Sequence, residues 1–238
     1  MKSKMAEAVK LKNSPVVVIW TDEKPENALQ FKEGKWGCVA SMLGAAAKGR
    51  TVVFDEKTAG CGGGAAGLGF RKYERGFIEQ FLSTGSPEKE GEHYKKTPDH
   101  AKVFIDNLPD IPVPTKYVVF KPLEKVTGEE VPQVVVFLVN ADQLSGLVTL
   151  ANYDKMTQDN VTVSFGAGCH STILFPLEQA KSDNPKALIG LTDPSAREFL
   201  DKDILSFSVP YKRFLEMESN VEESFLKTKT WTKVAERI

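Results

Sequence analysis

The stretch TVVFDEKTAGCGGGAAGLGF, residues 51–70, joins a β-like run to six glycines within ten residues, with Cys61 near their start. The run from Thr51 to Asp55 is rich in β-branched residues and predicts a buried strand. Glycines that follow a strand predict a loop whose backbone can approach a ligand closely. The stretch therefore leaves two alternatives, a loop that binds phosphate and a loop that presents a thiolate.

Strand-like and helix-like segments alternate on both sides of this stretch. Strands are expected at 16–20, 51–55, 117–121, 133–139, 161–165, 187–191 and 205–209. Helices are expected at 38–48, 73–82, 98–107, 142–153, 173–181 and 211–226. This alternation predicts an α/β fold, with α+β as the alternative, in a single domain over residues 1–238.

The two halves of the chain share an order of elements. Residues of about 14–108 and about 115–226 both read strand–helix–strand–cysteine loop–helix. The tripeptide Ala59-Gly60-Cys61 in the first half matches Ala167-Gly168-Cys169 in the second. This echo indicates either an internal duplication or two ordinary α/β units with valine-rich strands.

Composition narrows the class of protein. The net charge of −1 gives no reason to expect nucleic acid or an anionic membrane as a partner. The charged start MKSKMAEAVK lacks the apolar core of a signal peptide, and no apolar run is long enough to span a membrane. We therefore expect a cytoplasmic protein without structural disulfides. A homo-oligomer is compatible with the sequence.

The three cysteines, Cys38, Cys61 and Cys169, occur in one kind of setting. Each follows a glycine, and each lies where a loop or strand leads into an expected helix. Free backbone N–H groups and the helix dipole favour negative charge at such a place, which lowers the pKa of a thiol. The pattern favours thiolate ligands over the alternative of small buried packing residues.

These thiolates predict an iron–sulfur cluster of the 4Fe–4S type. No Cys-x-x-Cys is present, so the zinc-ribbon and ferredoxin spacings are excluded. Three dispersed cysteines can hold a cluster and leave one iron for a non-cysteine group or a substrate. Gly60, Gly62, Gly63 and Gly168 are expected to supply backbone amides around it. The expected role is redox or Lewis-acid chemistry on a small molecule, or exchange of electrons with a redox partner protein.

A zinc ion bound by the cysteines and His170 is the alternative metal site. His170 adjoins Cys169 and could not easily reach the same ion, so a surface or capping role is equally reasonable. The charged segment 85–98 carries His93, which is expected to be solvated together with His100. Whether the protein is an enzyme stays open.

Two further functions are compatible with the sequence. One is a metal-free thiol enzyme in which Cys61 is the nucleophile. The other is a small-molecule or nucleotide-binding module, because Gly62, Gly64 and Gly67 match G-x-G-x-x-G. That match lacks the acidic strand tip of a dinucleotide fold and the Walker lysine.

Aromatic and charged side chains near the cysteines complete the expected site. Trp20, Trp36 and Phe165 are expected to form apolar walls. Asp193 and Arg197 lie four residues apart at a short helix that begins at Pro194, and they are expected to pair with each other, with a charge that faces a pocket as the alternative.

Several separated motifs resemble one prokaryotic family, the domain of unknown function 169, which is common in archaea and anaerobes. They are PVVVIW, GCVASMLGAAAKGRTVVF, AGCGGGAAGLGF, GAGCHSTILFP and LTDPSAREFL followed by LSFSVPYKRFLEM. Cys61, Gly62, Gly63, Leu68 and Gly69 match the family's Cys-Gly-Gly and Leu-Gly pattern. Through its cysteine loops, the resemblance implies a metal- or cluster-bearing protein whose activity is unsettled.

Overall fold

The protein is built around one seven-stranded sheet, seen in a computed structural model that describes residues 1–238. The strand order is β2-β5-β1-β6-β9-β8-β7. The strands are β1 (Val16–Thr21), β2 (Val52–Phe54), β5 (Tyr117–Pro122), β6 (Pro132–Val139), β7 (Val161–Thr162), β8 (Ala187–Gly190) and β9 (Leu205–Pro210). Only the pair β7–β8 is parallel, and the other neighbours are antiparallel.

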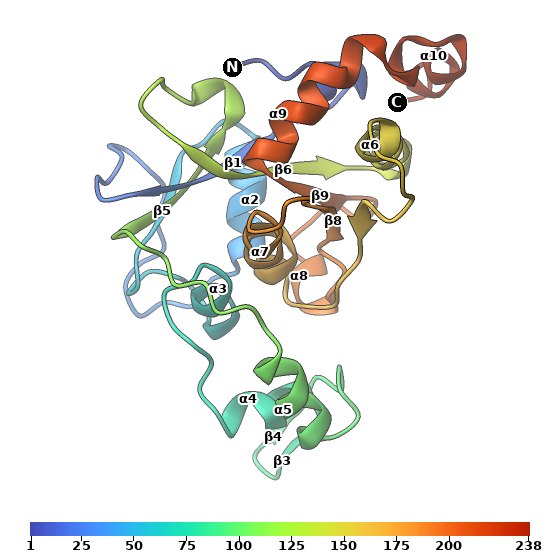
Figure 1. Cartoon of the computed structure of the whole chain (residues 1–238). Coiled ribbons are helices and arrows are strands. Elements are labelled where there is room, and N and C mark those ends of the chain that lie inside the picture. The colour runs from blue at the N-terminus through green and yellow to red at the C-terminus, as the bar shows by residue number, and fades with distance from the viewer.

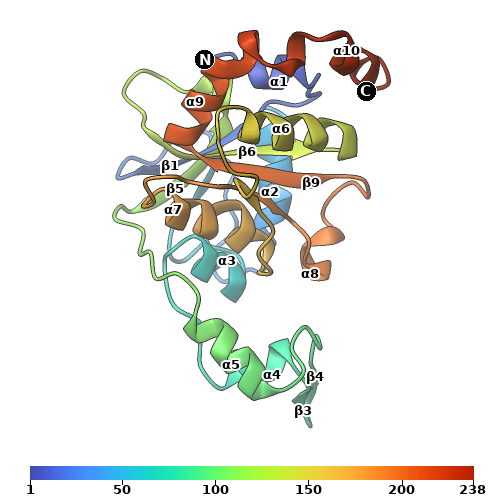
Figure 2. The same cartoon turned by 45° about the vertical axis from the view of Figure 1, so that its right-hand side comes forward.

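Helices cover both faces of this sheet (Figures 1 and 2). The helices are α1 (Lys4–Ala8), α2 (Val39–Ala47), α3 (Gly62–Gly67), α4 (Phe77–Leu82), α5 (Pro98–Asp106), α6 (Ala141–Tyr153), α7 (Phe175–Gln179), α8 (Pro194–Arg197), α9 (Tyr211–Asn220) and α10 (Lys229–Ala235). A π-helical turn, η2 (His170–Leu174), leads into α7, and three 3-10 turns are η1 (Leu123–Lys125), η3 (Val221–Glu223) and η4 (Phe225–Lys227). The predicted α/β class is confirmed.

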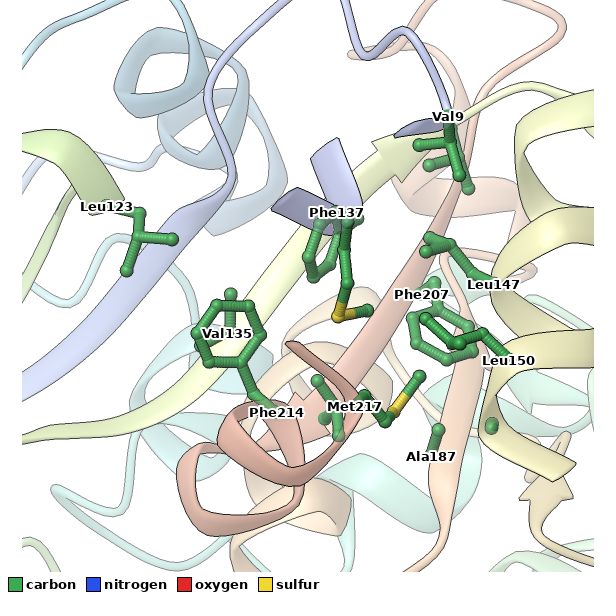
Figure 3. Packing of buried hydrophobic residues seen from close by; sticks show 14 of the residues in the cluster. Val9, Leu123, Val135, Phe137, Leu147, Leu150, Ala187, Phe207, Phe214 and Met217 are labelled. Carbon is green, nitrogen blue, oxygen red and sulfur yellow. The ribbon is translucent and has the colours of Figure 1, made fainter. Parts of the chain in front are cut away.

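Alternating side chains of the central strands feed two separate cores. In β1, Val17 and Ile19 point to a core that includes side chains of α1, α6, α9 and α10. Val16 and Val18 point to the opposite core, which includes side chains of α2, α3 and η2. Successive residues of a strand face opposite sides, so a run without polar residues fits a sheet that is buried on both faces. Figure 3 shows the first core, where Phe137, Phe207 and Phe214 pack together.

A small lobe of α4, α5 and the two-stranded ribbon β3 (Gly85–Ser86) and β4 (Lys89–Glu90) extends away from the sheet (Figure 1). Two extended connections join it to the body, one before α4 and one after α5. The second connection holds Pro109, Pro112 and Pro114, which the sequence predicted to be extended. The charged segment 85–98 belongs to this lobe, and His93 and His100 are exposed, as expected.

The glycine-rich segment differs from its prediction. It is a helix, α3, and not a loop, although glycine is a poor helix former. Tertiary packing outweighs that propensity, because Gly64, Ala65 and Leu68 are buried against the sheet face that carries α2. The predicted helix 73–82 begins only at Phe77, and the predicted helix 211–226 ends at Asn220 before two 3-10 turns.

The internal duplication stays a prediction that the arrangement does not support. β1 and β6 are antiparallel neighbours, so a twofold axis relating them would keep corresponding helices on one face of the sheet. The helices that follow them, α2 and α6, lie against opposite cores. The shared order of elements therefore reflects local sequence more than a shared three-dimensional unit.

No helix combines the length and the apolar character that crossing a membrane requires.

Candidate functional site

The three cysteines converge on one cavity, although they lie far apart in the sequence. Cys38, Cys61 and Cys169 all line a cavity of about 530 Å³. Each occupies the N-cap position of a helix: α2, α3 and η2 respectively. The cavity lies between these helix starts and the lobe of α4 and α5, and its size is typical of small-molecule sites. The fold thus places the predicted ligand residues together.

Cys61 is held by the start of its own helix. Its backbone is extended, and its Sγ accepts a hydrogen bond from the Gly64 amide at 3.2 Å. Gly64 has no room for a side chain, because an added Cβ would lie 2.4 Å from the Ala59 carbonyl oxygen. The amide that contacts this sulfur therefore comes from a glycine that the sequence analysis placed only in a phosphate-binding pattern.

Cys169 joins η2 to α3. Its side chain is buried, and its Sγ donates a hydrogen bond to the Gly63 carbonyl at 2.9 Å. A Cβ added to Gly67 would lie 2.7 Å from the same sulfur. The glycines of α3 thus allow this helix to approach a cysteine from the other half of the chain.

The four glycines that were predicted to supply backbone amides to the cluster do not all lie at the cavity. Gly62, Gly63 and Gly168 line the cavity, whereas Gly60 does not. Gly60 has a φ of +80°, and a Cβ there would lie 2.3 Å from the Gly37 carbonyl oxygen, so it serves the turn before Cys61. None of the four donates its amide to a cysteine sulfur, and Gly64 alone does so.

Burial and mutual repulsion dominate the electrostatics of the cysteines. Burial raises the pKa of the Cys38 thiol, the amides of Ala40 and Ser41 oppose this, and the charge of Cys61 raises it further. Burial raises the pKa of the Cys169 thiol well above its ordinary value, and the charges of Cys61 and Asp193 add to the effect. The thiolates are therefore costly to form together unless a positive centre lies between them.

His170 lies inside the protein, and the surface role considered for it is wrong. It is 1% exposed, and its Nε2 lies 3.0 Å from the Tyr73 hydroxyl, in an edge-on contact between the rings. Burial lowers the pKa of His170 to about 4, so the ring is neutral near pH 7. Tyr73 was missed by the sequence analysis, since nothing local marks a tyrosine in a connection as part of a site.

The donor set fits a cluster better than a single ion. No three side chains among His, Cys, Asp and Glu lie close enough together to hold one metal ion. A zinc ion draws all its ligands to one centre, whereas each thiolate of a 4Fe–4S cluster binds a different iron, and such thiolates lie farther apart. Three thiols that line one cavity match the donor chemistry of such a cluster and would leave one iron without a thiolate.

The lobe closes the cavity with aromatic side chains. Phe104 and Tyr94 contact Phe165 of the body at ring-centroid distances of 5.5 and 5.9 Å. The Tyr94 hydroxyl accepts a hydrogen bond from the Ser195 amide at 3.1 Å. Phe165 and Trp36 line the cavity as expected, whereas Trp20 packs into the core beneath α2. The charged segment of the lobe thus contributes one wall of the site.

A phosphate loop is not visible in the glycine-rich segment. Gly62, Gly64 and Gly67 all lie within α3, which starts directly after Cys61. The Gly64 amide is directed to a sulfur, and Gly67 lies against Cys169. The Gly64 amide and the position of Gly67 are therefore already used, whereas Gly62 and Gly63, at the start of α3, line the cavity.

Together these features define a class of protein, a three-layered α/β protein with a three-cysteine cavity beneath an aromatic lobe. The chain belongs to the DUF169 family, described as Uncharacterised ArCR, whose family profile matches residues 4–220. The match includes all three cysteines and the whole lobe. No curated protein and no solved structure matches the chain.

Proposed function

We propose that this protein binds an iron–sulfur cluster, 4Fe–4S, through Cys38, Cys61 and Cys169. The supporting observation is that these cysteines, at three separate helix starts, line one cavity. Thiolates are the ligands that such clusters prefer. When bound, the cluster would supply an electron or a Lewis-acidic iron to a small molecule in the same cavity.

The remainder of the cavity is suited to a small molecule. Its lining is mostly apolar, with Phe77, Phe81 and Phe104 contributed by the lobe. Arg71, Lys72 and Lys89 supply positive charge, and Lys89 also lies 5.2 Å from the centre of the Phe81 ring. An apolar chamber with basic side chains suits a small organic anion. We therefore propose chemistry on a small molecule in preference to electron exchange between proteins alone.

The proposal is tested by anaerobic purification of the wild type and of Cys61→Ser, followed by a visible spectrum and iron and zinc analysis. We expect a brown wild-type protein with about four irons per chain and a Cys61→Ser protein that has lost them. Ser145→Ala, an exposed position near the start of α6 on the opposite face of the sheet, is the control and should keep its iron. A wild type that contains zinc, or no metal when kept free of oxygen, would contradict the proposal.

A further inference from the structure

Asp193 is a buried carboxyl side chain in the cysteine cavity. It follows β8, after a turn in which Leu191 is fully buried with a φ of +59°, and it directly precedes α8. The residue is 2% exposed and lines the cavity together with all three cysteines. A Cβ added to Gly168 would lie 3.5 Å from its Oδ1, which places that oxygen beside the backbone that carries Cys169.

The Asp193 carboxylate lacks the partners that a buried charge normally has. Its Oδ2 accepts one hydrogen bond, from the Ser195 hydroxyl at 2.9 Å, and its Oδ1 is buried without any partner. The side chain makes no capping hydrogen bond to α8. The expected pair with Arg197 is absent, because that guanidinium donates to the carbonyls of Lys202 and Ile204.

The absence of a hydrogen-bond partner for the buried Oδ1 of Asp193 requires a physical explanation. The Arg197 charge acts on Asp193 without forming a hydrogen bond, so Oδ1 stays unpartnered, and a bound ion or ligand is one recognised explanation of such an atom. The three cysteines and Asp193 thus line one cavity, and no lysine or arginine forms a salt bridge with Asp193.

We propose that Asp193 is the fourth ligand of the cluster, an oxygen donor to the iron that the three cysteines leave without a thiolate. This inference rests on the proposed function. Carboxylate oxygen is a harder donor than thiolate and suits cluster iron less well. The iron bound by Asp193 is therefore the one at which a small molecule in the cavity can replace a protein ligand.

The test compares three variants with the wild type after anaerobic cluster loading. Asp193→Asn keeps the shape of the side chain but removes the charge, and Asp193→Cys restores a thiolate. Glu74→Gln is the matched control, because Glu74 is the other carboxylate in the cavity lining and lies on the lobe side. The readouts are iron per chain and the electron paramagnetic resonance spectrum.

Asp193→Asn is expected to lose about one iron of four after mild oxidation, with the spectrum of a three-iron cluster, while Glu74→Gln keeps all four. Recovery of the fourth iron in Asp193→Cys would support the assignment. Full iron and an unchanged spectrum in Asp193→Asn would overturn it and leave the proposed function intact. A wild type without iron would overturn both. Urea unfolding of metal-free Asp193→Asn should match or exceed the wild type, which separates ligand loss from misfolding.

Discussion

The two faces of the sheet each bury a charged side chain, and they surround it in opposite ways. On the face with α9, the Arg213 guanidinium is 1% exposed and donates to Asp154 at 2.6 and 2.7 Å, to Glu216 at 2.8 Å and to the Ala151 carbonyl at 3.1 Å. On the face with α2 and α3, Asp193 is equally buried and has an oxygen without a partner. Arg213 therefore has its hydrogen-bond partners within the protein, whereas one oxygen of Asp193 has none.

This difference separates a structural charge from a functional one. A buried ion that is fully hydrogen-bonded holds its elements in place, so α9 and the end of α6 are joined by Arg213. A buried carboxylate oxygen without a hydrogen bond lowers the stability of the fold and does not hold two elements together. The unpartnered oxygen of Asp193 lies on the face that carries the cysteine cavity.

The largest expected effect on stability follows from the removal of Arg213, the buried charge that is hydrogen-bonded to its neighbours. Arg213→Ala should lower the free energy of unfolding by about 3–5 kcal/mol, because it opens a void and leaves Asp154 without its cation. Arg237→Ala, which removes an exposed pair with Asp142, should cost less than about 1 kcal/mol. Urea unfolding of metal-free protein measures both. Similar costs for the two variants would contradict the assigned structural role.

A smaller effect is expected at the two ends of α3. Gly67→Ala should cost roughly 1–3 kcal/mol in unfolding free energy, because the added methyl group would overlap Cys169. It should also lower iron content by moving that sulfur. In Gly62→Ala the added methyl group has no neighbouring atom within 4 Å. This substitution should be neutral or should stabilise the protein by up to about 1 kcal/mol. Equal tolerance at both glycines would show that α3 can move away from η2.

The smallest expected effect is on the pH dependence of stability, through the Asp154 carboxyl. The Arg213 hydrogen bonds hold the pKa of the Asp154 carboxyl below its ordinary value. A depressed folded-state pKa means that the contribution is fully present above the unfolded-state pKa of about 4 and is lost as pH falls through the folded-state value. The difference in melting temperature between wild type and Asp154→Asn should thus shrink on acidification below about pH 4. A constant difference down to about pH 2 would rule out this linkage.

Most of the secondary structure was predictable because its signals are local. The β-branched runs of β1, β5 and β6 and the Pro194 at the first position of α8 identify their elements within a few residues. α3 was mistaken for a loop, since its six residues include four glycines and its stability comes from contacts with Val39, Ala59 and Cys169. Its helical state depends on neighbours that the local sequence does not contain.

The candidate site was predictable in its donors and not in its surroundings. The Gly-Cys pairs before helices identified Cys38, Cys61 and Cys169, because the chemistry of a helix start depends on the adjacent residues alone. The expected pair of Asp193 with Arg197 was wrong, whereas the alternative of a charge that faces a pocket agrees with the position of Asp193 in the cavity lining. The Arg197 guanidinium binds carbonyls beyond its own helix, so the state of Asp193 depends on tertiary contacts.

The sequence by itself determined the α/β class, the family and the Gly-Cys setting of each cysteine, since these depend on periodicity and on neighbouring residues. Only the tertiary structure decided that the three sulfurs face one cavity, that the charged segment 85–98 belongs to the lobe that covers it, and that Asp193 lies among them unpaired. Those facts depend on the order of strands in the sheet and on contacts between residues far apart in the chain. No local pattern encodes such contacts.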